Sequence, residues 1–308
     1  MFKNIVGHES IKKILENNIK TKNILHSYLF IGEEGIGKQT LGKEFAKAVL
    51  CNSEDEKPCD TCKPCVEFNT KNNVNFTIIN EEEVAIKIEQ IRNMQVKIAE
   101  KPLNSDYKIY LINDADLMTT EAQNCLLKTL EEPPEYIVII LITSNENKIL
   151  NTIKSRCMKI YFNKLENSDI KKILEERFEV SDINDSFLDA ASGSIKKALL
   201  IKENSSEYEQ INKIFDIIDK ENLVSFINSA SSIYESKDDI YNILDYINIL
   251  LDIKIKKNTK DSFKYAKCIF IVEEVKKRLR ANSNYDMSID YLLMNMWKEI
   301  NSERSSRY

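Results

Sequence analysis

Glycine, histidine and excess positive charge are all scarce in this chain. Only six of its 308 residues are glycine, against an average of about 7% in proteins. The two histidines, His8 and His26, lie too far apart to suggest a nucleophile–base pair, so we expect both to form local hydrogen bonds. The net charge of −5 excludes a wholly basic nucleic-acid-coating protein and allows only a local basic face.

Long hydrophobic runs are missing as well. The longest, residues 136–143, is far shorter than the ~20 residues of a membrane-spanning helix, and the first ten residues lack the apolar stretch of a signal peptide. We therefore expect a cytoplasmic protein without membrane contact. The hydrophobic content of 43% excludes a disordered chain, and the length suits about two domains.

The first half of the chain alternates short β-rich runs with helical patterns, which is typical of a parallel sheet covered on both faces. One helix is predicted to begin with a capping box at Thr120, to bury Ala122, Leu126 and Leu130, and to stop at Pro133. The predicted strands are residues 28–31, 76–80, 108–113, 137–143 and 158–162.

After about residue 163 only helical periodicity continues. Short helices over 167–178 and 186–203 predict a small helical domain around Gly193. Beyond about 205, apolar residues recur every three or four positions without glycine or proline, which predicts a compact bundle of about five helices. These are expected over residues 208–219, 221–234, 238–256, 263–281 and 288–302.

A glycine-rich loop follows the first predicted strand. Residues 32–38 read Gly-Glu-Glu-Gly-Ile-Gly-Lys. In this pattern, backbone N–H groups surround phosphates and the lysine reaches the β and γ oxygens. Gly32, Gly35, Gly37 and Lys38 are therefore candidate ligands of ATP or ADP.

The residues that should hold Mg²⁺ beside such a loop are incomplete. Gln39 replaces the usual Ser or Thr and is a poorer ligand, and Thr40 is turned about 100° away on the helix. The strand-end carboxylate of a P-loop ATPase is replaced by Asn113, which Asp114 and Asp116 follow. The sequence therefore predicts a weakened or relic ATPase that can still bind nucleotide, with Gln39, Thr40 and Asp114 as further candidate residues of the nucleotide site.

Four of the seven cysteines lie close together, at Cys51, Cys59, Cys62 and Cys65. Their spacing suits four thiolates around a tetrahedral Zn²⁺, and in a reducing compartment it favours metal ligands over disulfides. An iron–sulfur cluster can use similar spacing, although structural zinc is favoured beside a nucleotide loop. We expect the zinc to fold the loop between a helix and the second strand and to perform no chemistry.

Together these motifs resemble one family, the clamp-loader subunits of bacterial DNA polymerase III, and most closely its delta-prime members. The resemblance spans essentially the whole chain. Its further marks are Val-Gly-His at 6–8, Leu-His-Ser-Tyr-Leu-Phe at 25–30, Leu-Leu-Lys-Thr-Leu-Glu-Glu-Pro-Pro at 126–134, Thr-Ser-Asn at 143–145, Ser-Arg-Cys at 155–157 and Arg-Ala-Asn-Ser-Asn at 280–284.

The resemblance implies an α/β P-loop core of the AAA+ type over residues 1–163, with a zinc-binding insert around 51–65. It also implies a helical lid over 164–205 and an all-α collar over 206–308, through which five subunits form a ring. In that family the Ser-Arg-Cys arginine reaches into the neighbouring subunit's ATP site, so Arg156 is the arginine-finger candidate.

Two further nucleotide contacts are carried over from the family's motifs. One is Asn145, and the other is Lys196, where ATPase relatives have a lid arginine. Lysine keeps the charge of that arginine but lacks its bidentate fork. The implied partners are the gamma/tau and delta subunits, the sliding clamp and primer-template DNA, within a holoenzyme that is a nucleotidyltransferase.

Three functions stay open on the sequence alone. The first is a clamp-loader subunit with little or no ATPase of its own, which takes part in ATP-dependent loading of the clamp on primed DNA. The second is an active gamma/tau-like ATPase that uses Asp114 and Asp116, which the missing hydroxyl and carboxylate disfavour. The third is a zinc-stapled nucleic-acid-binding module, which the acidic balance disfavours.

Overall fold

The computed structural model describes residues 1–54, 56–80, 85–180, 183, 185–203, 205–237, 240–257, 262–281 and 283–302. The chain divides into two compact units, which are described separately. The first contains Met1–Val180 and Gly193–Ile195, and the second contains Ser181–Ser192 and Lys196–Tyr308. Among the helices in the described ranges, none has the length and apolar character needed to cross a membrane.

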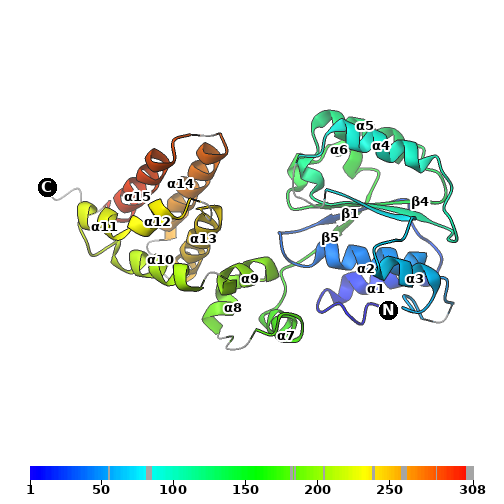
Figure 1. Ribbon diagram of the computed structural model, residues 1–308, viewed down its shortest axis with the longest axis horizontal. Helices are drawn as coiled ribbons and strands as arrows, with labels where there is room; N and C mark the ends of the chain where they lie inside the picture. Colours follow the sequence, from blue (N-terminus) through cyan, green and yellow to red (C-terminus); the bar gives the residue numbers. More distant parts are fainter. Residues whose placement is uncertain are drawn as a thin grey trace. The chain divides into compact units, whose positions relative to one another are not determined.

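A five-stranded parallel sheet in the order β2-β3-β4-β1-β5 forms the centre of the first unit (Figure 1). All five predicted strands are confirmed to within one residue at each end. For β1, β3 and β4 the reason is burial: every residue of these strands is buried, so they are almost entirely apolar runs. The strands are β1 (Ser27–Ile31), β2 (Phe76–Ile79), β3 (Lys108–Ile112), β4 (Ile137–Thr143) and β5 (Met158–Tyr161).

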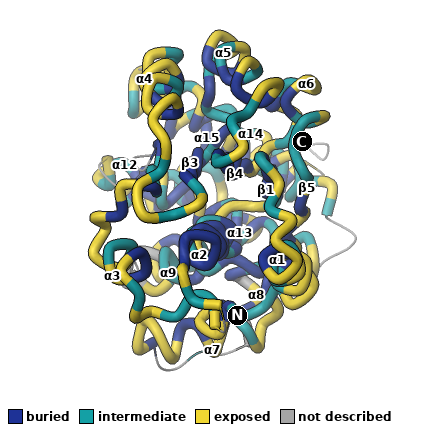
Figure 2. Tube along the Cα trace, turned by 90° about the vertical axis from the view of Figure 1, so that its right-hand side faces the viewer, coloured by how far each residue is buried: buried dark blue, intermediate teal, exposed yellow. Residues whose placement is uncertain are grey.

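Helices cover both faces of this sheet, as Figure 1 shows. Alternate strand residues face opposite sides, so Phe30 packs with the helices of one face and Leu29 with those of the other. Figure 2 shows α2 in the dark blue of buried residues. One face carries α1 (Glu9–Lys20), α2 (Lys38–Leu50) and α3 (Lys63–Asn69), and the other α4 (Ile88–Ile98), α5 (Thr120–Glu131) and α6 (Asn151–Lys154).

The start of α5 corrects one prediction. The capping box predicted at Thr120 is wrong, because the N-cap is Thr119, whose hydroxyl accepts the Ala122 N–H at 3.2 Å. Gln123 does not reach back to the cap; its amide donates to the Lys148 carbonyl at 2.9 Å. The predicted buried stripe is confirmed at Ala122, Leu126 and Leu130.

All the described secondary-structure elements of the second unit are helices, and they surround a core of aliphatic and aromatic side chains. The helix predicted over 221–234 is two helices, α11 and α12, which meet at Ala230. The predicted start at Asp238 and the motif residue Asn282 lie outside the described residues. The helices are α8 (Asp185–Ala191), α9 (Ile195–Glu203), α10 (Ser205–Ile217), α11 (Leu223–Ser229), α12 (Ser231–Glu235), α13 (Ile240–Lys257), α14 (Ser262–Arg280) and α15 (Tyr285–Ile300).

The two predicted lid helices fall on either side of the division. Helix α7 (Asn167–Phe178) has the predicted bounds and belongs to the first unit. Helix α8 and all but the first residue of α9 belong to the second unit. The domain boundaries at 163 and 205 stay predictions.

Candidate functional site

The glycine-rich loop of residues 32–38, referred to below as the phosphate loop, joins the carboxyl end of β1 to the start of α2. Gly35 and Gly37 have φ angles of 76° and 95°, a left-handed region that side-chain-bearing residues rarely adopt. At Gly32 a Cβ atom would come within 2.8 Å of the Phe162 carbonyl oxygen. The three predicted glycines are thus required by the backbone, and they lead directly into the N-terminus of α2, a helix end that favours an anion.

Lys38, the lysine of this loop, is only 6% exposed. Its ammonium donates to the carbonyl oxygens of Gly32, at 2.7 Å, and Glu33. Burial lowers the pKa of Lys38, and the nearby carboxylate of Asp114 partly offsets this effect. The charged group therefore lies within the loop, where phosphate oxygens could replace carbonyls as its partners. Gln39 follows, half-buried.

His8 contacts this loop, although it lies 28 residues before Ile36 in the sequence and local patterns gave no sign of the contact. The predicted hydrogen bond is present but is not local in the sequence: Nε2 lies 2.7 Å from the carbonyl oxygen of Ile36, 28 residues along the chain. Since a carbonyl only accepts, Nε2 is the donor. The ring also packs edge-on against Phe162 at 4.9 Å, and burial lowers the pKa of His8. The local hydrogen bond predicted for His26 is not borne out at its Nε2, which is buried without a hydrogen-bond partner among the described residues.

The acidic residues after β3 are engaged with their neighbours. The Asn113 amide is buried and donates to Asp114 Oδ2 at 2.8 Å. Asp116 accepts from the Thr143 hydroxyl at 2.7 Å and from the Ser144 N–H at 3.2 Å, which ties the end of β3 to the end of β4. The Asp116 carboxylate could replace the missing strand-end carboxylate as a metal ligand, but its hydrogen bonds hold the end of β4.

Asn145 lies two residues beyond β4, at the same edge of the sheet as the phosphate loop. The carbonyl of Thr143, at the end of β4, accepts the Gly32 N–H at 3.2 Å. The side-chain oxygen of Asn145 caps the short helix Glu146–Lys148 by accepting the Asn147 N–H at 3.1 Å. Its predicted nucleotide contact stays a prediction.

The segment at Gly193 also contacts the phosphate loop. The Ser194 hydroxyl donates to the Glu34 carbonyl at 2.9 Å, and the Ile195 N–H donates to the Gly35 carbonyl at 2.9 Å. These contacts join segments 160 residues apart, so sequence periodicity could not reveal them. The next residue, Lys196, is an exposed residue of α9 in the second unit.

Arg156 lies at the opposite edge of the sheet. It precedes β5, and its backbone carbonyl accepts from the hydroxyl of Ser27, the first residue of β1. Since Gly32 follows the last residue of β1, the whole strand, about 16 Å at ~3.3 Å per residue, separates Arg156 from its own phosphate loop. The guanidinium is one-third exposed and donates to Glu131 and to the Thr152 carbonyl, both at 2.8 Å.

The four clustered cysteines converge in the structure. Their Sγ atoms all lie within 4.8 Å of one another, and those of Cys51 and Cys62 are 3.8 Å apart. All seven cysteines are free thiols. Because tetrahedral zinc with Zn–S bonds of about 2.3 Å places its sulfurs about 3.8 Å apart, the geometry fits a tetrathiolate metal site.

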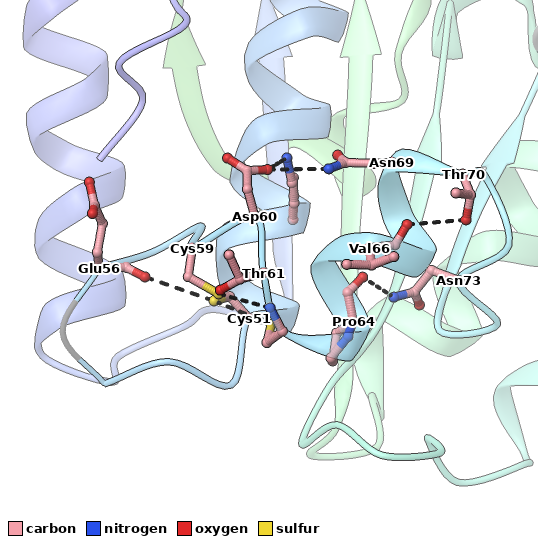
Figure 3. Close-up of polar contacts among 12 residues, drawn as sticks. Cys51, Glu56, Cys59, Asp60, Thr61, Pro64, Val66, Asn69, Thr70 and Asn73 are labelled. Carbon is pink, nitrogen blue, oxygen red and sulfur yellow. Dashed lines mark hydrogen bonds and ion pairs between the residues drawn. The ribbon is translucent and has the colours of Figure 1, made fainter.

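Helix ends position these thiols (Figure 3). Cys51 is the C-cap of α2 and Cys62 the N-cap of α3. The Thr61 hydroxyl and the Cys62 N–H donate to the Cys59 sulfur at 3.6 and 3.3 Å, and these bonds lower the pKa of Cys59 to about 6. Burial raises the pKa of Cys51 and Cys65. Donors to sulfur are typical of a site that stabilises thiolates.

Comparison with known proteins adds the following. The profile of a family described as "DNA polymerase III, delta subunit" matches residues 7–166, which include the phosphate loop, the four cysteines and Arg156. A DNA polymerase III delta-prime subunit from Bacillus subtilis is 33% identical over 174 residues, which are 56% of this chain and 52% of that protein. The tau subunit of the same organism is 32% identical over 243 residues, 77% of this chain and 42% of that one.

A gamma/tau subunit from Mycoplasma genitalium is 32% identical over 250 residues, which cover 75% of this chain and 41% of that protein. The chain thus spans about half or less of the length of these relatives. Among solved structures, a DNA polymerase III gamma subunit-related protein from Thermotoga maritima aligns with a TM-score of 0.54 and 20% identity, over 92% of this chain and 99% of that one. At that identity the likeness establishes the fold alone.

Proposed function

The chain belongs to the DNA polymerase III delta-subunit family, and on that premise we propose that it is a clamp-loader subunit that completes the ATP site of a neighbouring subunit. One observation carries the proposal. Arg156 is separated from its own phosphate loop by the length of β1, yet its guanidinium reaches solvent. An arginine in this place can contact a nucleotide only in another chain, as a trans-acting finger does.

In this proposal the chain hydrolyses little ATP itself. Gln39 supplies no hydroxyl, the Asn113 amide donates to one oxygen of Asp114, and Asp116 is bonded to the end of β4. Mg²⁺ requires near-ideal octahedral oxygen coordination, and these residues offer few oxygens for it. The phosphate loop and Lys38 are retained, so ATP or ADP binds without efficient turnover. Asn145 and Lys196 are proposed further contacts.

Zinc is the proposed occupant of the cysteine cluster, with Cys51, Cys59, Cys62 and Cys65 as ligands. The metal would supply a structural cross-link and no reaction chemistry, since four thiolates fill a tetrahedral site. It would connect the end of α2 to the start of α3. Support comes from the mutual distances of the sulfurs.

The relatives' names support other DNA polymerase III subunits as partners, and the specific partners are proposed. They are the gamma/tau and delta subunits, arranged with this chain in a five-membered ring in the cytoplasm. The ring would load the sliding clamp on primer-template DNA during replication. Residues 164–205 are the proposed lid and residues 206–308 the proposed collar through which subunits associate.

The experiment that tests the finger is a loader reconstituted from purified subunits with Arg156→Ala in this chain. DNA-stimulated ATP hydrolysis at the completed site should fall about 10³-fold or more, the usual effect of removing a trans arginine. Arg92→Ala, which removes an exposed arginine from α4, is the matched control. Unchanged hydrolysis in the Arg156→Ala loader would overturn the assignment.

An active ATPase is the second candidate, because the Asp114 carboxylate lies close enough to Lys38 to offset part of the lowering of its pKa by burial. In that case the isolated chain would hydrolyse ATP steadily with Mg²⁺, and Lys38→Ala would abolish the activity. The first proposal expects no more than background hydrolysis from the isolated wild-type chain.

A further inference from the structure

A buried lysine lies beside the cysteine cluster. Lys47 is in the last turn of α2, its side chain is 7% exposed, and its ammonium forms an ion pair with Asp60. Removing an ammonium from water is costly unless it is paired. Glu44, one turn earlier, is a second carboxylate near it. Lys47 therefore has a structural environment that an ordinary surface lysine lacks.

Its partner Asp60 lies in the turn between two of the cysteines. Asp60 follows Cys59 directly and has a φ of 61°. Its Oδ1 atom also accepts from the side-chain amide of Asn69 in α3 at 3.3 Å, and Figure 3 shows the two residues joined by a dashed line. The carboxylate thus connects the cysteine turn to both α2 and α3.

The backbone of this turn also contacts a sulfur of the cluster. The Cys62 N–H donates to the Cys59 sulfur at 3.3 Å, so the backbone of the turn that contains Asp60 closes onto a sulfur of the cluster. Asp60 lies between this sulfur and this donor in the chain, so moving it would displace one ligand and one hydrogen-bond donor together. Fixing Asp60 to Lys47 fixes the geometry of this side of the cluster.

Charge gives the lysine a second role. Four thiolates around Zn²⁺ carry a net charge of −2, which is costly to hold among buried groups unless a cation is near. The Lys47 ammonium is electrostatically coupled to Cys65, and the C-terminal end of a helix itself favours a cation.

We propose that Lys47 and Asp60 are positioning residues of the metal site. Their ion pair holds the Cys59–Cys62 turn against α2 so that the four sulfurs are gathered before metal binds, and the ammonium offsets the negative charge of the zinc tetrathiolate. The inference rests on the proposed zinc occupancy. Outer-shell residues of this kind typically change metal affinity by about 10–100-fold.

The test is zinc affinity of the full-length chain, measured by competition with a chromogenic chelator. Lys47→Met keeps the apolar stem and removes the charge, and Asp60→Asn keeps a residue that tolerates the left-handed conformation. Each should weaken zinc binding by about 10–100-fold. Lys47→Arg should restore most of the affinity, because it returns the positive charge.

The matched control is Lys63→Met. Lys63 lies next to Cys62, but its side chain is 69% exposed and its ion pair with Glu67 spans 3.7 Å. Loss of an exposed pair of this kind should change affinity by no more than about threefold. Absorption spectra of the Co²⁺-loaded chains should show the same tetrahedral thiolate bands in every variant that still binds metal.

The outcomes separate the two claims. A well-folded wild-type chain that binds no zinc contradicts the proposed metal site. A wild-type chain that binds zinc, with Lys47→Met and Asp60→Asn variants of equal affinity, contradicts the positioning role alone. If Lys47→Met does not fold, the Asp60→Asn affinity decides the matter.

Discussion

Asn113 has an amide nitrogen at the position where P-loop ATPases have a carboxylate oxygen, and this difference changes the hydrogen bonding of Asp114. The nitrogen donates to Asp114 over 2.8 Å, so it orients the neighbouring carboxylate toward itself. An amide is a neutral, weaker ligand for a hard cation than a carboxylate. Asn113 and Gln39 together leave a carboxylate charge and a hydroxyl missing from the place where a P-loop ATPase holds Mg²⁺.

Restoring those two groups should restore turnover. The double substitution Gln39→Thr and Asn113→Asp should raise Mg²⁺-dependent ATP hydrolysis by the isolated chain by about tenfold or more, equivalent to about 1.4 kcal/mol in the barrier. Steady-state phosphate release measures it. Asn147→Asp, an exposed change nearby, is the control. A double variant as inactive as the wild type would show that more than these groups is missing.

His8 gives the chain a predicted pH dependence. Burial lowers its pKa in the folded state below the ordinary value near 6.5, so the unfolded chain binds the proton more readily. His8 therefore leaves the free energy of unfolding undiminished above about pH 6.5. Below that pH the free energy of unfolding declines as the pH falls through the folded-state pKa of His8. Urea unfolding of wild type and His8→Asn, compared at about pH 7 and pH 5, measures this contribution.

Asparagine is suitable at position 8 because the backbone there is left-handed, with φ 56°. The variant should lose part of the stability difference between the two pH values. His26→Asn is the control for losing a histidine elsewhere. If the wild type and His8→Asn show the same pH dependence, the buried imidazole is not its source.

At the scale of elements, the strands were predictable and several contacts were not. Buried parallel strands are continuous apolar runs, so the sequence defines them to within one residue. The cap of α5 was misplaced because Thr119 and Thr120 are chemically alike and only the backbone distinguishes them. The contacts of His8 and Ser194 with the phosphate loop depend on the chain's path between distant segments, which local periodicity does not encode.

The cysteine loop is the element whose stability should depend on a metal. We expect one zinc per chain, lost in Cys62→Ser, because the loop between α2 and α3 places four sulfurs within 4.8 Å. Elemental analysis counts the metal. Removing it should lower the thermal midpoint by about 2–4 °C for each kcal/mol of stability lost.

Cys268→Ser is the control for that experiment, because Cys268 is a buried cysteine of α14 in the other unit. It should leave the zinc content unchanged. Full zinc content in Cys62→Ser would mean that the metal is held elsewhere.

At the scale of the whole molecule, the parallel sheet separates the two proposed sites. The phosphate loop lies at the carboxyl ends of the strands, where α/β proteins place their ligands, and Arg156 lies at the amino ends. Subunits that associate head to tail would bring the Arg156 edge of one sheet to the phosphate-loop edge of the next subunit. Such heterologous contacts form a closed ring when the rotation between neighbouring subunits divides a full turn evenly. The proposed role of Arg156 in a neighbouring subunit's ATP site requires that it lie away from the phosphate loop of its own chain.

The most direct test compares two substitutions in the same reconstituted clamp loader. DNA-stimulated ATP hydrolysis should stay near the wild-type rate with Lys38→Ala in this chain, because its own phosphate loop performs little turnover. It should fall steeply at the completed site with Arg156→Ala, because the neighbouring nucleotide loses its cation. A loader that loses hydrolysis with Lys38→Ala and retains it with Arg156→Ala would contradict the account.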